Sequence, residues 1–475
     1  YAAAAVRAAG HRVHVVDAFG ERPCQYRLTE KFMVRGLTPG QIDERILPQT
    51  DVIVLYAMNL MNHYSLIEIL RLLRQRRAQV PIVIMENTQA VTAYSLRRVS
   101  AELFDAGATY LLCGEPEERL VALLEAISRG GSPHSIDGVG WHDSQQEHFS
   151  PPTRFLSNLD DVPFPAWELF PLKRYWSLRY AHGAMERDRY LPLLTSRGCP
   201  YPCKFCVIPE TNGLRWRGRS PENVVEEIVH WQSTLGVTEF HIEDVNPTID
   251  DRRTQALCRQ IINKRLDIIW KVAAGTKAES IRSEETIDLM AHAGCRYISI
   301  SPESGSPEVM RRIGKPFDLE HAIQLVGRMN ASGIRSQCCF VLGFPGESDE
   351  DRQMTWQMVR RLVRSGVDEI ALFVVTPVPG AEIYGQFSGF EEYAELNFSP
   401  TWRGDFEQLN RFRLKLYLAF LMWKLRYHPG KLLAQPLYFL SRRFRTKMEM
   451  TPYRALHTSL MRFGLLGVRV SWEAA

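Results

Sequence analysis

The chain has 475 residues, a formal net charge of +4, 45% hydrophobic residues and 24% charged residues. This composition is ordinary for a soluble protein of two to four domains, and the small charge does not indicate nucleic-acid binding. Nine cysteines, an odd number in a long chain, favour a reducing compartment over a disulfide framework. No signal peptide is recognisable and no apolar run reaches about 18 residues, so we expect a cytoplasmic protein without a membrane-spanning segment.

Residues 1–130 alternate between helical and strand-like patterns. We predict helices at 1–9, 65–75 and 115–128, and apolar strands at 11–17, 51–56, 80–85 and 109–113. Short apolar strands separated by helices predict a doubly wound parallel sheet, in which ligands bind beyond the carboxyl ends of the strands. The chain opens on Tyr1 and an alanine-rich helix, so we expect the sequence to start inside this domain, after a first strand.

Residues 131–190 are predicted to form a connector. Gly138 to Ser150 has the pattern of a small hairpin, and the proline-rich run from Asn158 to Trp167 has the pattern of a loop.

From residue 191 to 388, strands and helices alternate again. The expected strands are 191–196, 239–244, 270–275, 297–301, 338–343 and 369–376, and the expected helix caps include Ser220, Ser283 and Asp318. Six βα units predict a partial (β/α)6 barrel, whose functional residues gather at the carboxyl ends of its strands.

Cys199, Cys203 and Cys206 form a C-x3-C-x2-C motif directly after the first of these strands. Three thiolates can bind three irons of a 4Fe–4S cluster and leave the fourth iron open to another ligand. Zinc is an alternative, but a structural zinc needs a fourth ligand, and no Cys or His lies between Cys206 and His230. Three buried structural thiols are the remaining alternative.

The run from Thr195 to Cys206 resembles the signature of the radical S-adenosylmethionine (SAM) superfamily. The resemblance implies that the three cysteines bind a 4Fe–4S cluster and that SAM chelates its open iron. One electron would then cleave SAM to methionine and a 5′-deoxyadenosyl radical. Phe205 matches the aromatic position of the family, whose backbone contacts adenine.

The ends of later strands resemble the same family. Ser301 to Ser306 resembles its ESGS stretch, and Gly343 to Glu347 resembles its GxPGE stretch. The resemblance implies SAM contacts from Glu303, Ser304 and Gly343. At the second strand end we expect Asp244 to contact SAM. Glu243 would then face away, because alternate strand residues point in opposite directions.

The first domain resembles the cobalamin-binding domain that precedes the radical SAM core in one large subfamily. The resembling pieces are AAGHRVHVVDA, at residues 8–18, and CGEPEERLVALLEAI, from Cys113 to Ile127. The resemblance implies that cobalamin binds between this domain and the barrel. The usual Gly-Gly loop is replaced by Glu86 to Ala90, and no D-x-H-x-x-G run supplies an axial histidine. A domain that keeps the fold without the ligand is therefore the alternative.

Residues 389–475 are predicted to be a helical C-terminal region. Between Gln408 and Met448 there are ten Lys or Arg residues and no Asp or Glu, with aromatic residues interleaved. Such a segment can lie on an anionic membrane surface or bind an anionic substrate, and a helical cap with a solvated basic face is the equal alternative. No nucleic-acid-binding module accompanies the charge, so we expect no nucleic-acid partner.

Together these features predict a radical SAM enzyme that carries out cobalamin-dependent methylation of an unactivated carbon in a small-molecule substrate. Its electron donor would be an external flavodoxin or ferredoxin. The alternatives are radical oxidation or cyclisation of a tetrapyrrole or lipid-like substrate, and a non-catalytic iron–sulfur or cobalamin sensor.

Overall fold

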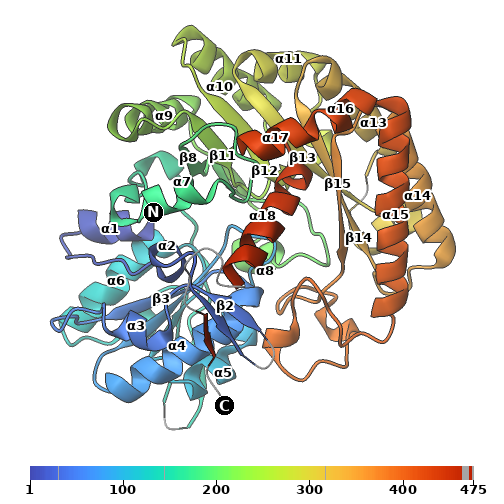
Figure 1. Ribbon diagram of the computed structural model, residues 1–475. Coiled ribbons are helices and arrows are strands. Elements are labelled where there is room, and N and C mark those ends of the chain that lie inside the picture. Colours follow the sequence, from blue (N-terminus) through green and yellow to red (C-terminus); the bar gives the residue numbers. More distant parts are fainter. Residues whose placement is uncertain (30–31, 144, 316, 463–469, 473–475) are drawn as a thin grey trace.

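The computed structural model describes residues 1–475 except 30–31, 144, 316, 463–469 and 473–475 (Figure 1). The chain forms two α/β units. The first is drawn in blue and cyan in Figure 1, the second in green to orange, and the red C-terminal helices lie against the second unit. Among the described residues, no helix is both long and apolar enough to cross a membrane.

The first unit is built on a five-stranded sheet in the order β3-β4-β5-β6-β7. Its strands are β3 (Ile53–Ala57), β4 (Ile82–Glu86), β5 (Tyr110–Leu112), β6 (Val139–His142) and β7 (Glu147–Phe149). The strands β3, β4 and β5 are parallel, while β6 and β7 pair antiparallel.

Helices cover both faces of this sheet because alternate residues of β4 point in opposite directions. Ile82 and Ile84 pack in one cluster with Leu70 of α4 (His63–Arg76) and Leu103 of α5 (Ser100–Asp105). Val83 packs in another cluster with Val6 of α1 (Ala2–Ala8) and Leu120 of α6 (Pro116–Ser128). The first unit is therefore an α/β fold with helices on both faces of its parallel strands.

The strand predicted at residues 11–17 was wrong. These residues form no strand, since their described backbone hydrogen bonds join them to no neighbouring strand. Val13 packs on the same apolar cluster as Val52 and Val54, and an apolar pattern indicates such burial but not the pairing of strands. The hairpin predicted from Gly138 to Ser150 is present as β6 and β7, and it extends the first sheet because β6 pairs with β5.

The second unit contains a six-stranded parallel sheet with its strands in chain order. They are β8 (Tyr190–Leu193), β11 (Glu239–Ile242), β12 (Ile269–Thr276), β13 (Cys295–Glu303), β14 (Arg335–Leu342) and β15 (Glu369–Val374). The main helices that follow these strands are α9 (Pro221–Leu235), α10 (Asp251–Asn263), α11 (Glu284–His292), α13 (Leu319–Ala331) and α14 (Asp349–Arg364). This is the architecture expected of a partial (β/α)6 barrel.

The caps predicted for these helices are present. The side chains of Ser220, Ser283 and Asp318 accept hydrogen bonds from backbone N–H groups at the starts of α9, α11 and α13. Such a cap stabilises a helix by about 1 kcal/mol.

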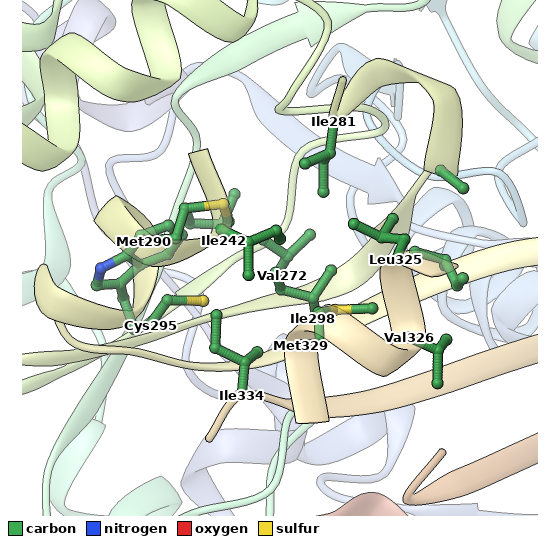
Figure 2. Close-up of a cluster of buried hydrophobic side chains, with 14 of the residues drawn as sticks. Ile242, Val272, Ile281, Met290, Cys295, Ile298, Leu325, Val326, Met329 and Ile334 are labelled. Atoms are coloured by element: carbon green, nitrogen blue, oxygen red, sulfur yellow. The ribbon is translucent and has the colours of Figure 1, made fainter. Parts of the chain in front are cut away.

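An apolar layer joins the strands of this sheet to its outer helices. Figure 2 shows Val272 and Ile298 from the strands beside Met290 of α11 and Met329 of α13. Burying a side chain of this size stabilises the fold by about 1.5–3 kcal/mol, so this layer holds the helices in place.

The C-terminal region packs on the last strand and on α14. The helix α15 (Phe406–Tyr427) runs alongside α14 and buries Leu416 and Phe420 in the core of the second unit (Figure 1). It is followed by α16 (Pro429–Leu433), α17 (Gln435–Ser441) and α18 (Lys447–Arg462).

The segment that leads into α18, together with the first turn of α18, contacts both sides of the sheet. The N–H of Phe444 donates to the carbonyl of Met185, shortly before the edge strand β8, and the N–H of Met448 donates to Glu369 of the other edge strand, β15.

Charged side chains fill the barrel near the amino ends of its strands. The Lys271 ammonium is fully buried, 3.0 Å from Glu239 and 2.9 Å from Glu186. Glu239 also accepts hydrogen bonds from the backbone N–H groups of Glu186 and Arg187 and lies 2.9 Å from His241. Burial raises the pKa of Glu239, but Lys271 and His241 outweigh it and hold this pKa at about 2.

We predict that Glu239→Gln lowers the free energy of unfolding by roughly 3 kcal/mol at pH 7, from the difference between pKa values of 4.5 and about 2. A carboxyl group with a depressed folded-state pKa contributes its full stability above pH 4.5, and this contribution is lost as the pH falls toward 2. The deficit of the variant should therefore shrink at pH 3. Urea unfolding at pH 7, 5 and 3 measures it, and a deficit that is the same at pH 7 and pH 3 contradicts the assignment.

Candidate functional site

A cavity of about 3270 Å³ lies between the two units. Its walls include the carboxyl ends of the barrel strands, together with β3 and the segment after β4 from the first unit. Typical ligand pockets measure roughly 300–1,000 Å³, so this space can hold more than one large ligand. The three cysteines of the C-x3-C-x2-C motif all line it.

The backbone holds the cysteine loop in place. Gly198 precedes the first thiol with a φ of +77°, and an added Cβ would lie 2.0 Å from the carbonyl oxygen of Arg215, so only glycine fits there. The N–H of Lys204 donates to Ile313, and the carbonyl of Lys204 accepts from Ile383. The loop is thus joined to two other parts of the barrel.

The three cysteines are half-buried on the cavity wall. Burial raises the pKa of Cys203 to about 11 and that of Cys206 to about 12, although nearby Lys315 acts in the opposite direction. Metal binding requires thiolates, so a metal that binds here displaces protons.

The three cysteine thiols could hold either a single metal ion or a 4Fe–4S cluster. Within the described ranges, no three His, Cys, Asp or Glu side chains are arranged to hold a single metal ion. In a 4Fe–4S cluster each thiolate binds a different iron, and three thiols on the wall of one cavity fit this requirement.

Glu303, at the end of β13, lies beside the cysteine loop. Its φ of +62° is a strained conformation for a residue other than glycine, and it costs about 1–3 kcal/mol. The Lys315 ammonium lies 2.6 Å from the Glu303 carboxylate and 2.8 Å from the carbonyl oxygen of Ser301, and 5.9 Å from the ring centroid of Phe205. A carboxylate, an ammonium group and an aromatic face therefore meet at this wall. Glu303 and Phe205, both predicted from the sequence, line the cavity, and their contacts with SAM stay predictions.

The Asp244 carboxylate is fully buried, and its contact with SAM stays a prediction. It accepts hydrogen bonds from the N–H and hydroxyl of Thr195 and from the hydroxyl of Ser196. This links the end of β11 to the chain after β8. Glu243 lines the cavity, 2.6 Å from His182.

The predicted SAM contacts of Ser304 and Gly343 also stay predictions. The Ser304 hydroxyl accepts from the N–H of Ser306 and contacts Thr355 of α14. Gly343 has a φ of +82°, and an added Cβ would lie 2.5 Å from Leu409 of α15. Both residues shape turns behind the strand ends.

Three cavity residues near the cysteines were not predicted. The Asn246 amide lies 3.9 Å from the Cys199 sulfur, and Lys277 lies 4.5 Å from the ring centroid of Tyr201. Lys315 is the third. Asn246 could have been found from the polar run after the second strand, whereas nothing in the local sequence marks Lys315 as a cavity residue.

Buried ion pairs join the first unit to the cysteine loop. Glu117 binds Arg197 through two contacts of 2.6 and 3.0 Å, and Glu115 binds Arg217 through two contacts of 2.8 and 2.9 Å. Burial raises the pKa of Glu117, but Arg197 outweighs this and lowers it overall. Both carboxylates belong to the CGEPEERL stretch, so this motif attaches the first unit to the barrel.

Comparison with known proteins identifies the second unit. Residues 193–359 match the Radical SAM superfamily, and this range contains the three cysteines, Glu303 and Lys315. The match covers this part of the chain, which therefore has the sequence features of a radical SAM domain.

The similar proteins include methyltransferases. The chain is 27% identical over 325 residues to an uncharacterized methyltransferase of Pyrococcus horikoshii, covering 65% of this chain and 66% of that protein. It is also similar to the radical SAM methyltransferase TsrM of Kitasatospora setae, with a TM-score of 0.58, 19% identity, and coverage of 71% of this chain and 64% of TsrM. Structures of TsrM contain tryptophan and a SAM analogue, or cobalamin and a [4Fe–4S] cluster.

A third similar protein is the cobalamin-dependent SAM radical enzyme OxsB, solved with aqua-cobalamin bound. It has a TM-score of 0.57 and 19% identity, with coverage of 80% of this chain and 50% of OxsB. At this level of identity, the solved structures show a shared fold. The chain spans between half and about two thirds of the length of these three proteins.

We predict that replacing any one of Cys199, Cys203 and Cys206 with Ala abolishes the brown iron–sulfur absorbance after anaerobic reconstitution. Cys258→Ala and Cys295→Ala are matched controls, because both thiols are fully buried in the core of the second unit. These controls should keep the absorbance. A Cys199→Ala protein that still cleaves SAM reductively would show that the ligand assignment is wrong.

We also predict that Glu117→Ala destabilises the protein by roughly 3 kcal/mol, because it leaves the Arg197 charge buried without its main partner. Glu320→Ala, which removes a solvent-exposed partner of Arg361, is the matched control and should have no measurable effect. Chemical denaturation at pH 7 compares the two variants. Equal stability of both would mean that the buried pair does not hold the units together.

Proposed function

We propose that this chain is a radical SAM enzyme that methylates an unactivated carbon of a small-molecule substrate with the help of cobalamin. The observation that carries the proposal is the position of the three thiols on the wall of one large cavity, which both units share. Similarity to methyltransferases, one of them solved with cobalamin and a [4Fe–4S] cluster, supports it.

In this proposal the three thiolates hold a 4Fe–4S cluster, which when bound supplies one electron for cleavage of SAM to a 5′-deoxyadenosyl radical. Glu303 is suited to accept hydrogen bonds from SAM, because its carboxylate is 7% exposed and faces the cavity. Lys315 holds that carboxylate in place, and the Phe205 backbone offers a contact for adenine. A carbon radical requires a site without water, and burial of the Glu303 and Lys315 side chains helps to exclude it.

The first unit offers an apolar surface for a corrin ring. Tyr56, Met58, Met61 and Val91 line the cavity and are between 38% and 50% exposed. Large apolar side chains exposed together mark a binding surface. The Glu86 to Ala90 loop, which replaces the usual Gly-Gly pair, lies at the same wall.

The Glu86 to Ala90 loop also carries a side-chain oxygen that accepts no hydrogen bond. The Gln89 side-chain oxygen is buried and has no hydrogen-bond partner, although the residue lines the cavity. A buried acceptor without a partner costs about 1–3 kcal/mol, and an amide side chain of a corrin can supply the missing donor. The residues present therefore fit the cofactor.

The proposed reaction needs a one-electron donor from outside the chain, for which a flavodoxin or ferredoxin is suitable. The non-catalytic sensor keeps the cluster but predicts no cleavage of SAM. Formation of 5′-deoxyadenosine by the anaerobically reconstituted protein, with a chemical reductant, separates the two functions.

We predict that the full chain retains hydroxocobalamin after gel filtration, and that Met58→Glu with Met61→Glu weakens binding at least tenfold while the cluster absorbance is unchanged. Carboxylates in place of these methionines would put charge against an apolar ring. Met354→Glu, at an equally exposed position on α14, is the control. A wild-type protein that retains no corrin would overturn cobalamin-dependent methylation and leave the radical SAM assignment standing.

A further inference from the structure

The outer face of the C-terminal helices is apolar, and no described part of the chain covers it. On α15 the exposed large side chains are Leu414, Leu418, Leu421, Met422 and Leu425. They recur at intervals of three or four residues, so they form one stripe along the helix. Leu433 of α16 and Leu437 and Leu440 of α17 continue this exposure along the chain.

This exposure differs from that of the rest of the protein. Leu418, Met422, Leu433, Leu437 and Leu440 are between 62% and 77% exposed. Outside α15, α16 and α17, no large apolar side chain in the described ranges exceeds 52%. Single exposed apolar residues are normal, but a contiguous group marks an interaction site.

The helix α15 is apolar on both faces. Leu416 and Phe420 face the barrel core, while Leu414 and Leu418 face outward. A helix that is apolar all round is normally buried on all sides, in a large core or in lipid. Packing against the barrel therefore explains the apolar residues on only one face of α15.

Basic side chains surround the stripe. Arg411, Lys415 and Arg426 are exposed on α15, and Arg442 and Arg443 are exposed just after α17. None of these five forms an ion pair with another described residue, and the sequence from Gln408 to Met448 contains no Asp or Glu. Three other cations of the segment act within the fold: Lys424 donates to Asp368, Lys431 to Gly366 and Lys447 to Ala273.

We propose that the face formed by α15, α16 and α17 docks on the surface of an anionic lipid bilayer, with its leucines in the boundary between headgroups and acyl chains. A helix with an apolar stripe and basic flanks lies in this interface, about 5–10 Å deep, without spanning the membrane. A second copy of the chain is a poorer occupant, because a two-fold contact through this face would bring the same unpaired cations together. The inference is independent of the proposed methylation.

Co-sedimentation of the full chain with vesicles tests the proposal. Binding to vesicles of phosphatidylglycerol mixed with phosphatidylcholine should be strong in 0.01 M salt. It should fall at least tenfold in 0.5 M salt, because the screening length shrinks from about 30 Å at 0.01 M to about 8 Å already at 0.15 M. Vesicles of phosphatidylcholine alone should bind at least tenfold more weakly.

Two variants separate the apolar contribution from the basic one. Leu433→Ser with Leu437→Ser and Leu440→Ser removes exposed leucines. Its control replaces three exposed apolar residues elsewhere with Ser, namely Val229, Ile262 and Met354. Arg442→Gln with Arg443→Gln removes two exposed charges, and its control is Arg252→Gln with Lys264→Gln on α10. Arg445 is left unchanged, since it is half-buried and lies 4.6 Å from the ring centroid of Tyr438.

Each tail variant should weaken vesicle binding at least tenfold, while its control and the thermal unfolding temperature stay at the wild-type level. Absence of binding in 0.01 M salt, or equal loss in the tail variants and their controls, would overturn the proposal. Sedimentation equilibrium measures whether the face is instead a dimer contact. A wild-type dimer that does not bind vesicles, and that the leucine substitutions dissociate, would also overturn the proposal.

Discussion

The buried ion pair between Glu117 and Arg197 links the two halves of the protein. Arg197 lies in β9 (Ser196–Gly198), two residues before Cys199, so one side chain sets both the attachment of the first unit and the path of the cysteine loop. Glu115 and Arg217 form a parallel pair beside it. Taking such charges out of water is costly unless both partners stay together, so the interface has a narrow choice of geometry. The cavity between the units depends on that geometry.

Much of the fold could be predicted because it depends on local patterns. The six parallel strands follow from apolar runs of the right length, and the helix starts follow from caps such as Ser220 and Asp318. The cysteine loop could be found for the same reason, since its three cysteines lie within eight residues of sequence. Residues 11–17 show the limit of this reasoning. Their apolar pattern indicates burial, but a strand also needs backbone hydrogen bonds to a neighbouring strand, which depend on the tertiary structure.

The site was predicted less completely than the fold, because the direction of a side chain depends on distant neighbours. Asp244 and Glu243 are adjacent, and only contacts with Thr195 and His182 decide which one reaches the cavity. Ser304 and Gly343 carry the residue types expected at a SAM site, yet their environment is α14 and α15. Lys315 comes twelve residues after its partner Glu303, and its role emerges only when the turn after β13 brings the two together.

Lys271 and the leucines of α17 depart from ordinary burial in opposite ways. Inside the barrel, Lys271 is charged and fully buried because Glu239 and Glu186 surround it and replace water. On the outside, Leu437 and Leu440 are apolar and exposed, and nothing in the described chain replaces water around them. Only a few residues after Leu440, Phe444 and Met448 bind the two sides of the open barrel. The segment that lines the cavity is therefore continuous in the chain with the face that lacks a cover.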